Sequence, residues 1–200
     1  MQTLLIASSN PGKLREFQSI LRDLNVKLVL PAEIGLSLQV EEDGANYYEN
    51  ALKKASAYCQ ASGLITLADD SGLEVDTLGG APGLHSARFS PKPGATDADR
   101  RSYLLEKLAG HQRPWPAHFH CTLMLVLPDG EQHTFIGECY GEISPQERGQ
   151  NGFGYDPIFM PEGRGKTMAE LPDEIKNRIS HRARAVLAAI PTLQEILRRE

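Results

Sequence analysis

The sequence contains few cysteines, and no two of them are closely spaced. Three occur in 200 residues, Cys59, Cys121 and Cys139. An odd number of distant cysteines provides no disulfide framework, and neither a C-x-x-C pair nor a cluster of histidine and cysteine suggests zinc. We interpret all three as reduced core residues, which favours a cytoplasmic protein.

The sequence also lacks an excess of basic charge and any long apolar run. Its formal net charge is −5 at pH 7, whereas a protein that coats nucleic acid needs a basic stripe. The first apolar residues lead straight into Ser8-Ser9-Asn10, which is unlike a secretion signal or a membrane span. We therefore expect no nucleic-acid partner and no membrane association, so any anionic ligand must meet a local cationic site.

What the sequence does contain is an alternation of short apolar runs with helical patterns. This order, together with a hairpin turn at Pro128-Asp129-Gly130, favours an α/β fold with a mixed sheet, flanking helices and two lobes around a central cleft. No linker or repeat divides the chain, so we interpret residues 1–200 as a single domain. The predicted strands are Thr3–Ala7, Lys27–Leu30, Ile65–Ala68, Phe119–Leu127, His133–Cys139 and Ile158–Met160. The predicted helices are Leu14–Leu24, Tyr47–Ala61, a stretch from Thr96 to before Gly110, and Pro172–Arg199 with breaks near Ser180 and Pro191.

The loop Ser8–Lys13 connects the first predicted strand to the first helix. Such a loop presents unpaired backbone N–H groups and the positive end of the helix dipole, which suits phosphate. Gly12 lets the backbone approach a ligand, and Lys13 adds a point charge. The spacing is not that of a P-loop. A capped helix start with a solvated lysine is therefore an equally good interpretation.

Two adjacent carboxylates, Asp69 and Asp70, follow the strand that is predicted to end at Ala68. At a strand's carboxyl end they would lie where ligands of open α/β sheets bind, and strand alternation indicates that only one faces the cleft. Glu41 and Glu42 offer further oxygen ligands for a hard cation such as Mg²⁺. The alternatives are a turn with capping duties for the aspartates and a solvated surface charge for either glutamate.

Two segments of the C-terminal half have a composition suited to recognising a base. Gly152–Asp156 combines a flexible backbone, two aromatic rings and a carboxylate. Lys176, His181 and Arg182 gather donors near a predicted helix break. A strained turn with core aromatics, and an ordinary charged helix face, are the respective alternatives.

Taken together, these segments resemble the inosine triphosphate pyrophosphatase family, also described as XTP/dITP diphosphatases. The resemblance covers nearly the whole chain. The matching blocks are Ala7–Lys13, Glu49-Asn50-Ala51, Ala68–Leu73, Gly80–Gly83, Ser86-Ala87-Arg88, Gly152–Pro157 and Ser180-His181-Arg182.

The resemblance implies an elongated α/β fold with a central cleft, a homodimer, and conversion of nonstandard purine nucleoside triphosphates to monophosphate and pyrophosphate. It implies that Asp70 is the catalytic acid-base residue and a magnesium ligand, and that Glu41 is a second metal-linked carboxylate. The residues it implies for substrate binding are Ser8, Ser9, Asn10, Pro11, Gly12, Lys13, Ser71, Phe153, Gly154, Tyr155, Asp156, Lys176, His181 and Arg182.

These residues support a specific hypothesis for the reaction. Asp70, with Mg²⁺, would orient and deprotonate a water for in-line attack at the α-phosphorus, and Lys13 would neutralise the leaving pyrophosphate. Lys176 and Arg182 only donate hydrogen bonds, so they would pair with a 6-keto oxygen and disfavour adenine. A phosphatase that acts on the γ-phosphate, a nucleotide sensor without turnover and a nucleic-acid-binding module are the competing classes.

Overall fold

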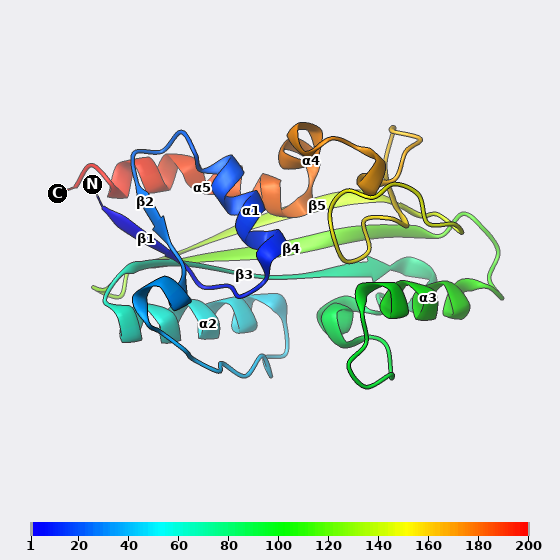
Figure 1. The fold of residues 1–200 in the computed structure, drawn as a ribbon, viewed down its shortest axis with the longest axis horizontal. Helices are drawn as coiled ribbons and strands as arrows, with labels where there is room; N and C mark the ends of the chain where they lie inside the picture. The colour runs from blue at the N-terminus through cyan, green and yellow to red at the C-terminus, as the bar shows by residue number, and fades with distance from the viewer. Residues whose placement is uncertain (1, 200) are drawn as a thin grey trace. The chain divides into compact units, whose positions relative to one another are not determined.

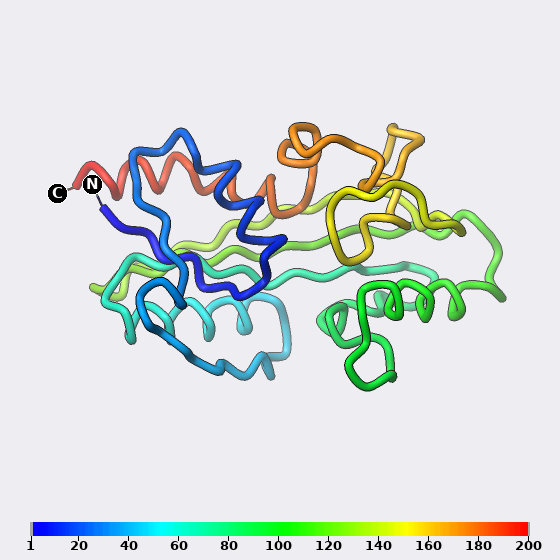
Figure 2. Tube along the Cα trace, in the orientation of Figure 1, coloured from blue at the N-terminus to red at the C-terminus, as the bar shows by residue number. Residues whose placement is uncertain are grey.

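The computed structural model describes residues 2–199 of the chain. The chain divides into two compact units. The first unit contains the chain up to Asp70, Cys121–Gly137, and the chain from His181 onward, whereas the second unit contains Ser71–His120 and Glu138–Ser180. Figure 2 traces the path of the chain by residue number.

The strands belong to a six-stranded sheet with the order β2-β1-β3-β4-β5-β6. β1 pairs in parallel with both β2 and β3, whereas β5 and β6 are antiparallel. The predicted mixed α/β fold with flanking helices is therefore confirmed (Figure 1). The strands are β1 (Thr3–Ile6), β2 (Lys27–Val29), β3 (Ile65–Val75), β4 (Pro116–Val126), β5 (Gln132–Ile143) and β6 (Phe159–Pro161). The α-helices are α1 (Pro11–Ile20), α2 (Tyr47–Ser62), α3 (Asp97–Leu108), α4 (Asp173–Ile179) and α5 (His181–Ile196), and the 3-10 helices are η1 (Pro31–Ile34), η2 (Asp76–Leu78), η3 (Gly83–Arg88) and η4 (Met168–Glu170).

In the first unit, helices cover both faces of the sheet. α1 and α5 lie on one face and α2 lies on the other (Figure 1). Successive β3 residues point to opposite faces, because Leu67 packs in the core with Phe17 and Val186, whereas Ala68 packs in a separate core with Ala51. The same alternation continues along β3 and determines toward which face of the sheet Asp69 and Asp70 each point.

The second unit has an apolar core of its own, which contains the only tryptophan of the chain. Trp115, Leu104 and Phe159 are buried there, and Phe119 meets Phe159 edge to face with ring centroids 4.8 Å apart. This core packs α3 and the segment around β6 into one stable body. Tyr155 of the irregular loop Gly152–Asp156 belongs to this core.

Local capping signals fix the ends of the helices that were predicted best. The Asn46 side chain accepts from the Glu49 N–H at the start of α2, and Gly63 ends the same helix with a positive φ of 66°. Thr96 caps α3 in a reciprocal arrangement with Asp99. These pairings satisfy backbone groups that a helix end leaves open, and they confirm both predicted helices.

β3 is longer than predicted, and the prediction that Asp69 and Asp70 follow the strand's end was wrong. The strand continues to Val75, so both carboxylates lie in its interior. Two polar residues interrupt the apolar pattern, but Leu73 and Val75 are fully buried beyond them. The backbone ladder therefore continues where the side-chain pattern stops indicating a strand.

The predicted break at Ser180 is confirmed, whereas the predicted break at Pro191 is wrong. α5 runs through Pro191 without interruption. The carbonyl that loses its usual donor belongs to Leu187, four residues earlier, and both side chains lie on the exposed face of the helix. Water can therefore solvate that carbonyl, and the helix continues.

Gly137 of β5 allows the first turn of α5 to lie against the sheet. A Cβ atom there would lie 2.1 Å from the His181 carbonyl oxygen and 2.5 Å from the Ala185 nitrogen. We expect Gly137→Ala to lower the free energy of unfolding by about 1–3 kcal/mol, the usual cost of overpacking. Chemical denaturation measures this change. Gly110→Ala is the matched control, because nothing lies within 4 Å of its Cβ position, and an equal loss in both variants would contradict the close contact.

Candidate active site

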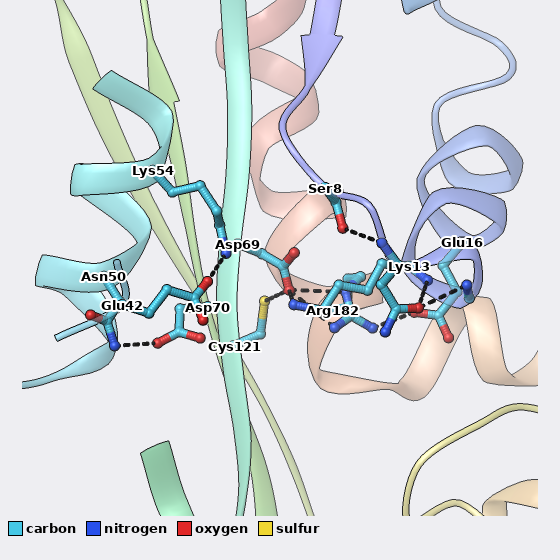
Figure 3. A network of polar contacts seen from close by, with 12 residues as sticks. Ser8, Lys13, Glu16, Glu42, Asn50, Lys54, Asp69, Asp70, Cys121 and Arg182 are labelled. Atoms are coloured by element: carbon cyan, nitrogen blue, oxygen red, sulfur yellow. Dashed lines mark hydrogen bonds and ion pairs between the residues drawn. The ribbon is translucent and has the colours of Figure 1, made fainter. Parts of the chain in front are cut away.

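The alternation of β3 sends its two neighbouring carboxylates to opposite faces of the sheet. Asp69 points toward α1 and α5, whereas Asp70 points toward α2 (Figure 3). The strand alternation behind the prediction is therefore present, and which of the two carboxylates faces a cleft stays a prediction. Each carboxylate has its own set of partners, so the first unit contains two polar clusters on the two sides of one strand.

Asp69 is the centre of a buried ionic cluster. Its Oδ2 accepts from Lys13 Nζ at 2.9 Å and from Arg182 Nη2 at 3.0 Å and Nε at 3.2 Å. Asp69 is 1% exposed and Arg182 is 2% exposed. Burial by itself would raise the pKa of Asp69, but Lys13, Arg182 and Lys54 outweigh it and hold this pKa far below its usual value. Asp69 is therefore a permanent carboxylate.

Glu16 of α1 completes this cluster, and the sequence reasoning missed it. Its Oε2 accepts from Arg182 Nη1 at 2.5 Å, across 166 residues of sequence. Glu16 follows Lys13 by three residues, so both side chains lie on one face of α1. This spacing could have indicated that Glu16 belongs to the same cluster as Lys13. Arg182 therefore directs its guanidinium donors at two carboxylates and joins α5 to both α1 and β3.

The loop Ser8–Lys13 is a capped helix start, as one of the two interpretations proposed. Asn10 Oδ1 accepts from the N–H groups of Gly12 at 2.9 Å and Lys13 at 3.2 Å, and the Asn10 N–H donates to Ser8 Oγ at 3.2 Å. Ser9, Asn10 and Pro11 are exposed, and Gly12 is buried. Lys13, however, is not solvated, because its ammonium pairs with Asp69. The cation is thereby held at the start of α1.

Asp70 lies in the second polar cluster, with side chains from α2 and the segment before it. The Asn50 Nδ2 donates to Asp70 Oδ2 at 3.0 Å, and Lys54 pairs with Glu42 at 2.5 Å (Figure 3). Burial and the nearby Glu42 raise the pKa of Asp70, against the lowering effect of Asn50, Lys54 and Lys13. Sequence reasoning missed Asn50 and Lys54 as site residues, although their four-residue spacing on a helix indicates a shared face.

The acidic segment before α2 contributes its two glutamates in different ways. Glu42 is half-buried and already neutralised by Lys54, whereas Glu41 is exposed. In the described part of the chain, no group of three or more acidic, histidine or cysteine side chains is arranged to hold a metal ion. Mg²⁺ does not need one, since it usually binds through one or two carboxylates, several waters and substrate phosphates.

In the second unit, the loop Gly152–Asp156 is tied to α4 through one carboxylate. Asp156 Oδ2 accepts from Lys176 Nζ at 2.5 Å and from the Phe153 N–H at 2.9 Å. The Lys176 ammonium also lies 4.6 Å from the centroid of the Phe153 ring. Both charged side chains are buried. The structure therefore brings Phe153, Asp156 and Lys176 together. The prediction that Lys176 and Arg182 share one donor site was wrong, because Arg182 pairs with Asp69 and Glu16 in the buried cluster of the first unit.

The other ring of this loop belongs to the core. Tyr155 is 5% exposed, packs with Ile158 and donates its hydroxyl to the Ser86 carbonyl at 2.8 Å. Burial raises the pKa of Tyr155. Tyr155 thus fits the interpretation of a core aromatic, and Phe153 is the half-buried ring of the loop.

The structure places the remaining predicted residues on regular elements. Ser71 is a half-buried residue of β3 in the second unit, and His181 is a buried residue that begins α5 in the first unit.

No helix in the described part of the chain has the length and apolar character needed to cross a membrane.

Comparison with known proteins points to one family. The model of the Ham1 family matches residues 4–192. A protein of Geobacter sulfurreducens named dITP/XTP pyrophosphatase is 46% identical over 186 residues, which cover 93% of this chain and 94% of that protein. A Bacillus subtilis protein of the same name is 41% identical over 186 residues, with the same coverage of both chains.

A solved structure leads to the same family. The structure of a HAM1 protein from Coxiella burnetii is similar to that of this chain, with a TM-score of 0.87 and 40% sequence identity. The match covers 98% of this chain and 100% of the HAM1 chain.

Proposed function

The chain belongs to the Ham1 family, and on this basis we propose that it hydrolyses nonstandard purine nucleoside triphosphates, namely ITP, dITP and XTP, to monophosphate and pyrophosphate. It is then a nucleoside triphosphate pyrophosphohydrolase. Removing such nucleotides from the pool keeps their bases out of DNA and RNA.

The observation that supports this function best is the setting of Asp70. A carboxylate whose pKa is raised by burial is a stronger base than an exposed one. The Asn50 amide fixes its orientation. Asp70 accepts the proton of a water molecule, and that water attacks the α-phosphorus in line with the departing pyrophosphate.

The first unit also provides the cations that a triphosphate requires. Lys13 supplies charge at the start of α1, and the Ser8–Lys13 loop adds hydroxyl groups and the helix dipole. Lys54 is a second cation, because Asp69, Glu42 and Asp70 raise its pKa more than burial lowers it. Charge stabilisation of the pyrophosphate by these groups lowers the barrier.

The residues present fit a magnesium ion. Asp70 and the exposed Glu41 would hold it, while the Glu42–Lys54 pair fixes the segment that carries Glu41. When bound, the ion supplies charge neutralisation at the phosphate oxygens and favours deprotonation of water. Asp70 and its neighbouring side chains orient the attacking water, and Asp70 accepts its proton.

We expect Glu41→Gln to raise the Mg²⁺ concentration needed for half-maximal activity by about tenfold or more, because one of two carboxylate ligands is lost. Magnesium titration of ITP hydrolysis measures this change, and EDTA should abolish activity. Glu106→Gln is the matched control, as this residue is exposed on α3. An unchanged magnesium requirement in Glu41→Gln would remove Glu41 from the metal site.

The second unit provides the groups for the base. Phe153 contributes a ring face, and Lys176 is a cation that Asp156 holds in place. An ammonium donates to a 6-keto oxygen but meets the amine of adenine unproductively, so ATP is a poor substrate. Ser71, Gly154 and His181 complete the proposed substrate contacts, and Tyr155 supports the loop from the core.

A substrate panel tests this function. Purified protein with Mg²⁺ should release pyrophosphate from ITP, dITP and XTP and far less from ATP. Release of orthophosphate would indicate a γ-phosphatase, and tight binding of ITP without products would indicate a sensor. Either result would overturn the proposal.

We further propose that the protein is a cytoplasmic homodimer. The second unit has an exposed aromatic side chain that a partner can cover, since Tyr140 of β5 is 52% exposed and stacks on His118 with ring centroids 5.0 Å apart. Light scattering coupled to size exclusion measures the mass. A mass of one chain at micromolar concentration would contradict the dimer.

A further inference from the structure

One backbone position in the second unit is held on both sides by a single helix. The Gly154 N–H donates to Asp97 Oδ2 at 2.8 Å, and the Gly154 carbonyl accepts from Arg101 Nη1 at 2.8 Å. Asp97 and Arg101 lie four residues apart on α3, which places them on one face of the helix. Two side chains of α3 therefore grip the middle of Gly152–Asp156.

Both of these side chains have an additional charged partner that fixes them. Arg100 pairs with Asp97 Oδ1, and Glu147 accepts from Arg101 Nη2 at 2.9 Å. Burial alone would raise the pKa of Asp97, but the Arg100 guanidinium and the Gly154 N–H have a larger lowering effect. The pKa of Asp97 therefore lies below its usual value. Asp97 is therefore ionised at neutral pH, and hydrogen bonds to charged groups are about twice as strong as neutral ones.

The contacts from Asp97 and Arg101 to the N–H and carbonyl of Gly154 are here called the clamp. The clamp uses the backbone of Gly154 and leaves its Cα face open. Gly154 has a φ of 60°, and a Cβ atom there would meet nothing within 4 Å. The N–H and the carbonyl each bond to α3, so Gly154 contributes a fixed backbone path. On either side of it, the Phe153 N–H bonds to Asp156, and Tyr155 is anchored in the core.

We propose that Asp97 and Arg101 are positioning residues that set base selectivity, because they fix the loop that presents Phe153. This inference rests on the proposed function, in which that loop recognises the base. A loosened loop misplaces the ring relative to Lys176, and misplacement of a recognition group by about 1 Å can cost 10²-fold in rate. The catalytic Asp70 keeps its own partners in the first unit.

The test combines kinetics with amide hydrogen exchange on Asp97→Asn and Arg101→Met. Glu106→Gln and Arg164→Met are the matched controls, since both residues are exposed. We expect KM for ITP to rise about tenfold, kcat to change by less than about threefold, and the preference for ITP over ATP to fall. Exchange in the peptide that contains Gly152–Asp156 should accelerate only in the clamp variants.

Arg101→Lys separates positioning from general destabilisation, because it keeps the charge and one donor and should restore part of the ITP preference. Unchanged exchange in the clamp variants would overturn the clamp. Faster exchange with unchanged KM and selectivity would overturn its role in specificity. A uniform loss of kcat for every substrate, with KM unchanged, would indicate a structural role only and so contradict the proposal. Wild-type protein that fails to hydrolyse ITP would instead overturn the proposed function, while the exchange data still decide whether the clamp exists.

Discussion

Replacing Asp70 by Asn is expected to lower turnover of ITP by about 100-fold or more, on the usual scale of general-base catalysis. The amide is nearly the same size and keeps a hydrogen-bond acceptor for Asn50, but it cannot take a proton from water. The fold should persist, because Asp70 is not part of the buried cluster around Asp69. Steady-state rates at saturating ITP and Mg²⁺, with a melting curve, measure both effects.

Asp23→Asn is the matched control for this substitution, since the Asp23 side chain is 91% exposed and distant in sequence from every proposed site residue. It makes the same change of acid to amide and should leave turnover unaltered. Retention of more than about a tenth of wild-type turnover by Asp70→Asn would exclude Asp70 as the general base.

The largest expected loss of stability follows from replacing Asp69 by Asn. This change leaves two cations, Arg182 and Lys13, with Glu16 as the one remaining carboxylate partner in the buried cluster. Removing one partner of a buried ion pair costs about 3–5 kcal/mol. For a chain of this size, about 2–4 °C in Tm accompanies each kcal/mol, so Tm should fall by roughly 6–20 °C. Because the pKa of Asp69 is lowered by folding, its stabilisation is present above the unfolded-state pKa and disappears only as pH falls toward the lowered value.

A double-substitution cycle distinguishes this ionic cluster from general damage to the core. Asp69→Asn combined with Arg182→Met removes charges of both signs, so the combined loss should be smaller than the sum of the single losses. Asp43→Asn, at an exposed carboxylate of the same unit, should leave Tm nearly unchanged. Strict additivity of the two single losses would contradict the coupling between Asp69 and Arg182.

The sequence predicts the elements of this fold where local chemistry determines them. Asn46 and Gly63 delimit α2, and Thr96 starts α3, because capping depends only on neighbouring residues. The sequence does not predict that β3 continues through Asp69 and Asp70. Strand pairing is decided by the neighbouring strands, and two polar side chains interrupt the pattern on which the prediction depends.

The candidate site divides in the same way. The resemblance assigns Lys13, Asp70 and Lys176 to the proposed site, which stays a prediction, and alternation along a strand correctly placed Asp70 and Asp69 on opposite faces. No local rule pairs Glu16 with Arg182 across 166 residues, and none assigns the backbone of Gly154 to side chains of α3. Such contacts depend on tertiary packing, so only the structure provides them.

Hydrolysis of ITP in water labelled with oxygen-18 tests the central claim most directly. If the water deprotonated by Asp70 attacks the α-phosphorus, mass spectrometry should find the label in inosine monophosphate and none in pyrophosphate. Label in pyrophosphate would place the attack at the β-phosphorus. Formation of inosine diphosphate with labelled orthophosphate would place it at the γ-phosphorus, and either result would contradict the proposed reaction.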